Sequence, residues 1–196
     1  MKKAVVYIHG MGGNAAEAAH YAPLFPGCDV IGFDYRSQTP REAKAEFSAY
    51  FDGLCKRYDS VSVIAVSLGA YFAMHLADTS RIGRAYFISP VVDMEALILK
   101  MMKDADVTED ELCRKKRIGT LSWDYLCFVR ENPIRWNVPT QILYGENDTL
   151  TALETMTAFA EKLGASVEIM PNGEHWFHTP EQMRFLDEWI TERQKE

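Results

Sequence analysis

The stretch from Val61 to Ala70 constrains the fold of this chain more than any other. It reads Val-Ser-Val-Ile-Ala-Val-Ser-Leu-Gly-Ala, and an apolar, helix-like stretch from Tyr71 to Ala77 follows it. A β-branched apolar run of this length predicts a buried strand, and the small residues after it predict a sharp turn into a helix. Ser67 stands at the apex of that turn, between the small residues Ala65 and Gly69. Such a turn lifts the serine hydroxyl clear of the backbone, although a serine at this place can also simply cap the helix.

Short apolar runs alternate with helical patterns along most of the chain. The expected strands cover residues 4–8, 30–33, 61–66, 85–88, 140–144 and 166–170. Thr39, Thr151 and Thr179 each stand three residues before Glu or Gln, which predicts the start of a helix at each of them. The alternation predicts an α/β fold with a doubly wound, mostly parallel sheet of about six strands. In such a sheet, functional groups gather in the loops that follow the carboxyl ends of the strands.

The alternation stops between residues 91 and 137. Apolar side chains recur there at helical spacing, and a capping signal stands at Thr108. We therefore expect one domain spanning residues 1–196, with a helical insertion at about 91–137.

Four of the predicted loops carry groups that can do chemistry. They hold the glycine-rich stretch His9-Gly10-Met11-Gly12-Gly13, Ser67, Asp148 and His175. Each has an ordinary explanation when taken alone: a flexible turn, a helix cap, a loop cap before Thr151, and a partly buried aromatic side chain. Because no Gly-Lys-Ser/Thr follows the glycines, a nucleotide-binding loop is not expected. All four groups come together only if they share one edge of the sheet.

His175 and Asp148 each have a competitor of the same residue type elsewhere in the sequence. His178 lies three residues after His175, and Asp93 follows the strand before the insertion. His178 directly precedes the helix start at Thr179, and Asp93 is placed to stabilise the first turn of a helix. A metal site formed by His175, His178 and Glu174 lacks further ligands at suitable spacing. His178 and Asp93 thus have ordinary explanations at the helix starts beside them.

The combination of motifs resembles the α/β-hydrolase superfamily. Ala-Val-Ser-Leu-Gly is similar to its Gly-x-Ser-x-Gly nucleophile elbow, and His-Gly-Met-Gly-Gly is similar to its oxyanion loop. Gly-Glu-Asn-Asp and Gly-Glu-His-Trp resemble its acid and histidine motifs, in the chain order serine, acid, histidine. The resemblance implies a Ser67-His175-Asp148 triad with the backbone N–H groups of Met11 and Leu68 as oxyanion hole. It implies a serine hydrolase of carboxylesterase type, with an acyl-enzyme intermediate and no metal or organic cofactor.

By the same resemblance, the helical insertion forms a cap over the serine. Five of its apolar residues are predicted to line the substrate pocket, although they can equally seal the cap onto the sheet: Met94, Leu97, Met101, Trp123 and Phe128. Such a pocket favours a small acyl or aryl ester. An amidase or small-peptide hydrolase and a catalytically silent binding module remain as alternatives.

Composition limits the partners and the location. A net charge of −7, from 28 acidic and 21 basic residues, argues against nucleic acid and anionic membranes as partners. The apolar run near the N-terminus, Ala4 to Ile8, is too short for a signal-peptide core, and no apolar stretch reaches membrane length. Four widely spaced cysteines are typical of free thiols, so a cytoplasmic location is expected. Nothing in the sequence indicates an oligomeric state.

Overall fold

A six-stranded, wholly parallel sheet forms the centre of the molecule. The computed structural model describes residues 1–114 and 117–195. The strands are β1 (Lys3–Ile8), β2 (Asp29–Gly32), β3 (Ser60–Val66), β4 (Ile82–Ile88), β5 (Thr140–Gly145) and β6 (Ser166–Met170). Their order across the sheet is β2-β1-β3-β4-β5-β6, and every neighbouring pair is parallel. This confirms the predicted sheet.

The strand order reverses between β1 and β3. From β1 the chain steps to β2 on one side, returns to β3 on the other, and then continues outward strand by strand to β6. Ile8 pairs with Ala65, and Ala65 pairs with Phe87, so the carboxyl ends of the central strands lie at nearly the same level. In open α/β sheets ligands bind outside the carboxyl ends of the strands at this kind of switch point. The glycine-rich loop follows β1 here, and Ser67 follows β3.

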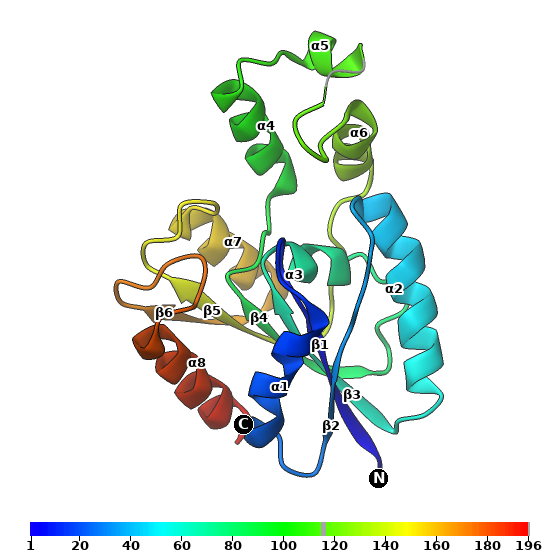
Figure 1. Cartoon of the computed structure of the whole chain (residues 1–196), viewed down its shortest axis with the longest axis vertical. Helices are drawn as coiled ribbons and strands as arrows, with labels where there is room; N and C mark the ends of the chain where they lie inside the picture. The colour runs from blue at the N-terminus through cyan, green and yellow to red at the C-terminus, as the bar shows by residue number, and fades with distance from the viewer. Residues whose placement is uncertain (115–116, 196) are drawn as a thin grey trace.

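Helices cover both faces of the sheet (Figure 1). On one face lie α1 (Ala18–Tyr21) and α8 (Pro180–Arg193). On the other lie α2 (Pro40–Cys55), α3 (Leu68–Ala73) and α7 (Leu153–Leu163). Two short 3-10 helices, η1 (Ala15–Glu17) and η2 (Ala22–Leu24), flank α1. The sheet is therefore doubly wound, as the alternation predicted.

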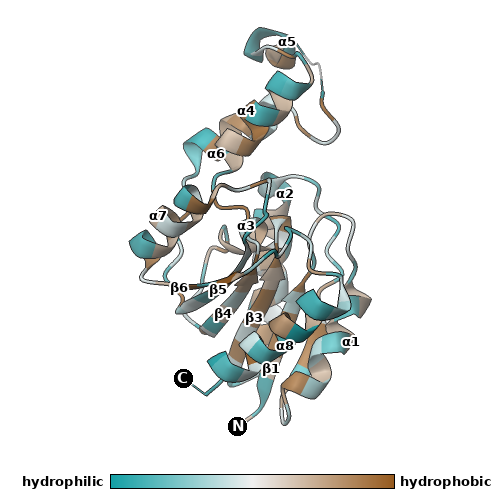
Figure 2. Ribbon diagram, turned by 90° about the vertical axis from the view of Figure 1, so that its left-hand side faces the viewer, coloured by the Kyte–Doolittle hydropathy of each residue, from teal (hydrophilic) through white to brown (hydrophobic). Residues whose placement is uncertain are grey.

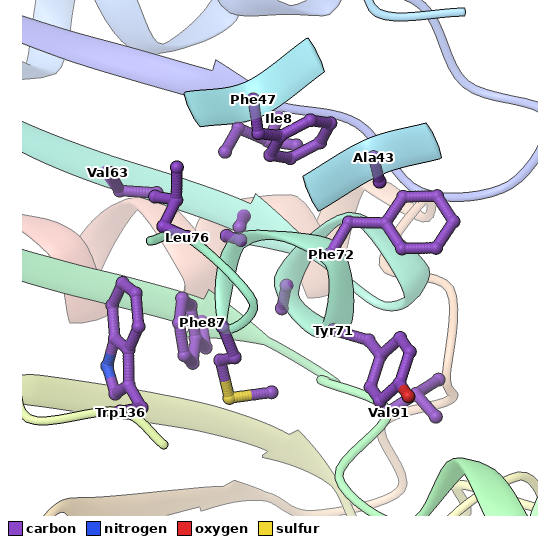
Figure 3. Close-up of a cluster of buried hydrophobic side chains, with 14 of the residues drawn as sticks. Ile8, Ala43, Phe47, Val63, Tyr71, Phe72, Leu76, Phe87, Val91 and Trp136 are labelled. Atoms are coloured by element: carbon purple, nitrogen blue, oxygen red, sulfur yellow. The ribbon is translucent and has the colours of Figure 1, made fainter. Parts of the chain in front are cut away.

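Side chains alternate along the strands between two hydrophobic cores. In β1, Val5 and Tyr7 face the core beneath α1 and α8, whereas Val6 and Ile8 face the core beneath α2 and α3. Figure 3 shows the second core, a cluster of buried side chains to which Phe47 of α2 and Ile8 of β1 both belong. The rings of Phe47 and Phe72 meet edge to face with centroids 6.0 Å apart. This packing fixes α3, and with it the turn that carries Ser67.

The cap consists of α4 (Met94–Asp104), α5 (Glu109–Cys113) and α6 (Trp123–Glu131), between β4 and β5. It stands beyond the carboxyl edge of the sheet (Figures 1 and 2). Arg130 joins the three helices, because its Nε donates to Glu95 at 2.6 Å and its two other nitrogens donate to Glu109 at 2.9 and 2.7 Å. Residues 115 and 116 of this segment lie outside the described residues.

Most strands differ from the sequence-based prediction by one residue at one or both ends, and three other element ends also differ. The helix after Ser67 ends at Ala73 instead of Ala77, because His75 and Leu76 donate to carbonyls three residues back and close the last turn early. Thr151 does not cap α7; the helix begins at Leu153, and the Thr151 carbonyl accepts a hydrogen bond from the Tyr144 hydroxyl. Strand β4 begins at Ile82, three residues before the predicted start. Apolar composition alone does not specify these ends.

In the described ranges, 1–114 and 117–195, no helix is both long enough and apolar enough to cross a membrane. The four cysteines, Cys28, Cys55, Cys113 and Cys127, are free thiols.

Candidate active site

Ser67 occupies a strained position between β3 and α3. Its φ of 50° and ψ of −117° lie in a region that non-glycine residues rarely adopt, at a cost of about 1–3 kcal/mol. The surrounding hydrogen bonds hold it there: Ser67 N–H donates to the Ile88 carbonyl at 3.0 Å, and Val91 N–H donates to the Ser67 carbonyl at 3.3 Å. Although Ser67 stands at the N-cap of α3, its side chain makes no capping bond. The hydroxyl is therefore not used for helix capping.

The small residues around Ser67 have distinct roles. A Cβ on Gly69 would lie 2.2 Å from the His9 carbonyl oxygen, so only glycine lets the turn pack this closely against the end of β1. A Cβ on Gly10 would lie 3.3 Å from the Ser67 Cβ. Ala65 is fully buried within the core, which accommodates its methyl group. Alanine in place of the first glycine of the motif is thus compatible with this turn.

Ser67, His175 and Asp148 form one hydrogen-bonded chain. Ser67 Oγ lies 2.8 Å from His175 Nε2, and His175 Nδ1 lies 2.6 Å from Asp148 Oδ2. A carboxylate can only accept, so Nδ1 carries the proton and Nε2 accepts from the serine hydroxyl. The other carboxylate oxygen of Asp148 accepts from the N–H groups of Leu150 and Thr151, at 2.8 and 3.2 Å. The Asp148 side chain is completely buried and is held by these hydrogen bonds. Its bond to Nδ1 therefore holds the imidazole in one orientation.

Two glycines bring the acid loop and the histidine loop together. A Cβ on Gly145 would lie 2.4 Å from the Glu174 carbonyl oxygen, and one on Gly173 would lie 3.1 Å from the Gly145 Cα. The loops are also joined by a hydrogen bond from Asn147 N–H to the Gly173 carbonyl at 2.7 Å. The glycines in Gly-Glu-Asn-Asp and Gly-Glu-His therefore allow the backbone contact that places Asp148 beside His175.

The competing acid and base lie elsewhere. Asp93 is the N-cap of α4 and accepts from Ala96 N–H at 2.9 Å. His178 Nδ1 lies 2.8 Å from the Trp176 carbonyl oxygen, and its ring stacks on the Trp176 indole. Both ring nitrogens of His175 are engaged within the chain to Ser67 and Asp148. Over residues 1–114 and 117–195, no group of three or more His, Cys, Asp or Glu side chains is arranged to hold a metal ion.

The glycine-rich loop after β1 is held on two sides. The Tyr35 hydroxyl donates to the His9 carbonyl at 2.9 Å, and the Tyr35 ring stacks on the His9 ring with centroids 4.3 Å apart. On the other side Glu17 accepts from Asn14 N–H at 3.0 Å and from the Tyr7 hydroxyl. Sequence reasoning missed Tyr35 and Glu17, because their roles depend on loops that become neighbours only in the folded sheet.

A cavity of about 450 Å³ opens above Ser67, between the sheet and the cap. Ser67, Leu68, His175 and Met11 line it, so the two predicted oxyanion donors belong to residues on its wall. Leu68 is the first residue of α3, and a helix leaves its first N–H groups without an acceptor in the helix. Volumes of 300–1,000 Å³ are typical of small-molecule sites, as a rough guide.

Three of the five predicted pocket residues line this cavity, and two do not. Met94, Leu97 and Met101, all on α4, form part of its wall. Phe128 instead packs edge to face on His75 at 5.6 Å, and Trp123 is half-buried against the core. The assignment of Phe128 and Trp123 to the pocket is therefore corrected: neither is among the described residues that line the cavity, and Phe128 lies one helical turn beyond Tyr125, where it packs on His75.

Other residues complete the wall of the cavity. Sequence reasoning missed six apolar or aromatic members of the lining among the described residues: Val66, Val91, Leu121, Tyr125, Leu150 and Trp176. Burial raises the pKa of the Tyr125 phenol far above its ordinary value, so this side chain stays neutral. Its hydroxyl contacts Met94 Sδ at 3.9 Å. The spacing of Tyr125 in α6 was visible in the sequence, but which side of α6 faces the serine was not.

Comparison with known proteins gives one relative in sequence and many in structure. No protein-family model matches the sequence. "Putative esterase/lipase 3" of Mycoplasma genitalium is 27% identical over 103 residues, a match that spans 46% of this chain and only 37% of that protein.

Solved structures match over nearly the whole chain. Alpha/beta hydrolase domain-containing protein 10 from mouse is 15% identical with a TM-score of 0.72, covering 98% of this chain and 89% of its own. An esterase of Pyrococcus furiosus is 20% identical with a TM-score of 0.64, covering 99% and 81%. A monoacylglycerol lipase of Paleococcus ferrophilus is 18% identical with a TM-score of 0.65, covering 96% and 94%. Together with the sheet order and the strained serine turn, these likenesses show that the chain has the α/β-hydrolase fold.

Proposed function

We propose that this chain is a serine hydrolase that cleaves a small, uncharged carboxylic ester. The observation that carries the proposal is the continuous chain from Ser67 Oγ through His175 to the buried Asp148 carboxylate, with spacings of 2.8 and 2.6 Å. A serine hydroxyl is a weak nucleophile until a base takes its proton, and a base held in this geometry is what it needs.

In the first half of the reaction, Ser67 Oγ bonds to the carbonyl carbon of the ester. Its proton passes to His175 Nε2, and Asp148 stabilises the resulting imidazolium. The bond between the carbonyl carbon and the leaving oxygen then breaks, and His175 returns the proton to that oxygen. The products are an alcohol and an acyl group on Ser67.

In the second half, water replaces the alcohol. His175 takes a proton from the water while the remaining hydroxide oxygen bonds to the acyl carbon. The bond to Ser67 Oγ breaks, and His175 returns the proton to the serine. One ester and one water thus give one alcohol and one acid, and no other reactant is required.

Backbone N–H groups stabilise the negative charge on the carbonyl oxygen in both halves. We assign this role to the N–H groups of Met11 and Leu68, which belong to residues that line the same cavity as Ser67. Donors that are already in place are effective because they need not reorganise as the charge develops. The fixed loop after β1, held by Tyr35 and Glu17, supports this assignment.

The cavity wall supports an apolar acyl group as substrate. Met94, Leu97 and Met101 of α4 line the cavity, together with Leu121 and Tyr125. Each methylene of an acyl chain buried there contributes about 0.8 kcal/mol. Among the described residues, the wall includes a single carboxylate, that of Glu17, whose oxygens already accept hydrogen bonds. A highly charged anionic substrate is therefore disfavoured.

A fluorophosphonate probe followed by peptide mapping tests the proposal. The folded protein is expected to form a covalent adduct on Ser67, and Ser67→Ala is expected to form none. An unlabelled Ser67 in folded protein would identify the chain as a silent binding module. A panel of p-nitrophenyl esters and aminoacyl amides then separates ester from amide hydrolysis, with faster turnover of the esters expected.

A further inference from the structure

Trp176 is the largest apolar side chain that is exposed in the described part of the chain. It directly follows His175, is 69% exposed and lines the cavity above Ser67. Met11, which is 76% exposed, and Leu150, which is 41% exposed, line the same cavity. Single exposed apolar residues are ordinary, but several gathered at the mouth of one cavity mark a binding surface.

The indole of Trp176 is held in place although it is exposed. Its ring stacks on the His178 imidazole, with centroids 4.3 Å apart and an angle of 17° between the planes. His178 Nδ1 lies 2.8 Å from the Trp176 carbonyl oxygen, and His178 N–H donates to Gln182 at 3.0 Å. Phe177, between them, is buried in the core beneath α8. The loop is thus anchored, and an aromatic surface that is already ordered loses little conformational entropy when it binds a ligand.

The chemistry of the proposed reaction determines which part of a substrate lies near Trp176. His175 Nε2 must give its proton to the leaving oxygen, so the alcohol portion lies on the His175 side of Ser67. Trp176 is the neighbour of His175 in the same loop. The acyl portion then lies away from His175, and Met94, Leu97 and Met101 of α4 are apolar residues of the same cavity that can bind it.

We infer that Trp176, supported by His178, binds the alcohol portion of the substrate, and that the substrate class is esters of planar aromatic alcohols. This inference rests on the proposed hydrolase function. An aromatic ring gains from stacking on another ring beyond the area it buries, which corresponds to roughly a 2- to 10-fold preference over a saturated ring of similar size. Trp176 is then a specificity-determining residue, and His178 positions it.

Benzyl butyrate and cyclohexylmethyl butyrate test this inference. Both are esters of primary alcohols of similar size with the same acyl group, and they differ mainly in the planarity of the ring. The ratio of their kcat/KM values reports the step in which the alcohol leaves. The wild-type ratio is expected to exceed one. Trp176→Leu is expected to lower that ratio roughly 2- to 10-fold, and Trp176→Phe is expected to retain most of it.

Two further variants separate stacking from general effects. Trp123→Leu removes a tryptophan that does not line the cavity and is expected to leave the ratio unchanged. His178→Leu keeps the indole but removes the imidazole stacked on it, so it is expected to lower the ratio in part. A decrease in both kcat/KM values by the same factor in Trp176→Leu would show a merely structural role and overturn the inference.

Labelling of Ser67 by the fluorophosphonate probe distinguishes failure of this inference from failure of the proposed function. Labelled protein whose ester ratio does not respond to Trp176→Leu refutes the aromatic-alcohol site alone, whereas unlabelled Ser67 refutes both. Sedimentation with phosphatidylcholine vesicles tests whether the exposed residues Met11, Leu150 and Trp176 bind a lipid surface instead of a substrate. If Trp176→Leu abolishes vesicle binding and leaves the ester ratio unchanged, these residues bind membranes and the inference is wrong.

Discussion

His75 offers a quantitative test of how the cap and the core are packed. Its side chain is 7% exposed and lies between the rings of Tyr71 and Phe128, with centroids 4.8 and 5.6 Å away. Within the described part of the chain, its Nε2 has no hydrogen-bond partner. Burial, with a smaller contribution from the charge of Lys44, lowers the pKa of His75 from 6.5 to about 4. The folded protein therefore holds this imidazole neutral.

The sign of the pH effect follows from proton binding. Between pH 6.5 and pH 4 the unfolded chain binds a proton at this histidine more readily than the folded protein does, so acidification favours unfolding. The stability contributed by the neutral form is complete above about pH 6.5 and is lost progressively as the pH falls to about 4. The full pKa difference corresponds to about 3 kcal/mol, of which about 2 kcal/mol is lost by pH 5.

Urea unfolding of the wild type and of His75→Leu at pH 7.5 and pH 5 measures this effect. The free energy of unfolding of the wild type is expected to fall between the two pH values by about 2 kcal/mol more than that of His75→Leu. Other titrating groups affect both proteins alike and cancel in the comparison. Lys44→Met removes only the smaller cause of the shift and should reduce the effect by a fraction. An equal pH dependence in wild type and His75→Leu would refute the argument that burial keeps His75 neutral.

Three further predictions concern the active site. Ser67→Ala, His175→Ala and Asp148→Asn are each expected to lower kcat for a p-nitrophenyl ester by about 10³-fold or more, non-additively, whereas His178→Ala and Asp93→Asn keep most of it. A comparable loss in either of the last two would overturn the assignment of base or acid. Gly69→Ala is expected to lose both thermal stability and activity, because the added Cβ would collide with the His9 carbonyl. The control variant Gly53→Ala lies within helix α2 with open space around it, and it is expected to gain about 0.5–1 kcal/mol in stability. Met101→Ala is expected to reduce the gain in kcat/KM per added acyl methylene, which is roughly fourfold at about 0.8 kcal/mol. An unchanged chain-length profile would exclude Met101 from the acyl site.

The local sequence determined the strands, most helices and the loops that carry the candidate triad. The β-branched run before Ser67, the Thr-x-x-Glu/Gln signals at Thr39 and Thr179 and the glycines beside Asp148 and His175 act within a few residues, so a linear pattern contains them. The chain order of serine, acid and histidine also indicated the fold, because parallel strands present their carboxyl ends at one edge of the sheet.

Only the tertiary structure decided which neighbours these groups have. His175, and not His178, lies beside Ser67. Its position depends on the backbone contact between Gly145 and Glu174, which are far apart in the sequence. Likewise, Tyr125 of α6 lines the cavity whereas Phe128, one turn further along the same helix, packs on His75. The apolar spacing in the sequence does not distinguish these two residues. A helical pattern specifies that one side of a helix is buried, but the partner against which it packs is set by long-range contacts that no local pattern contains.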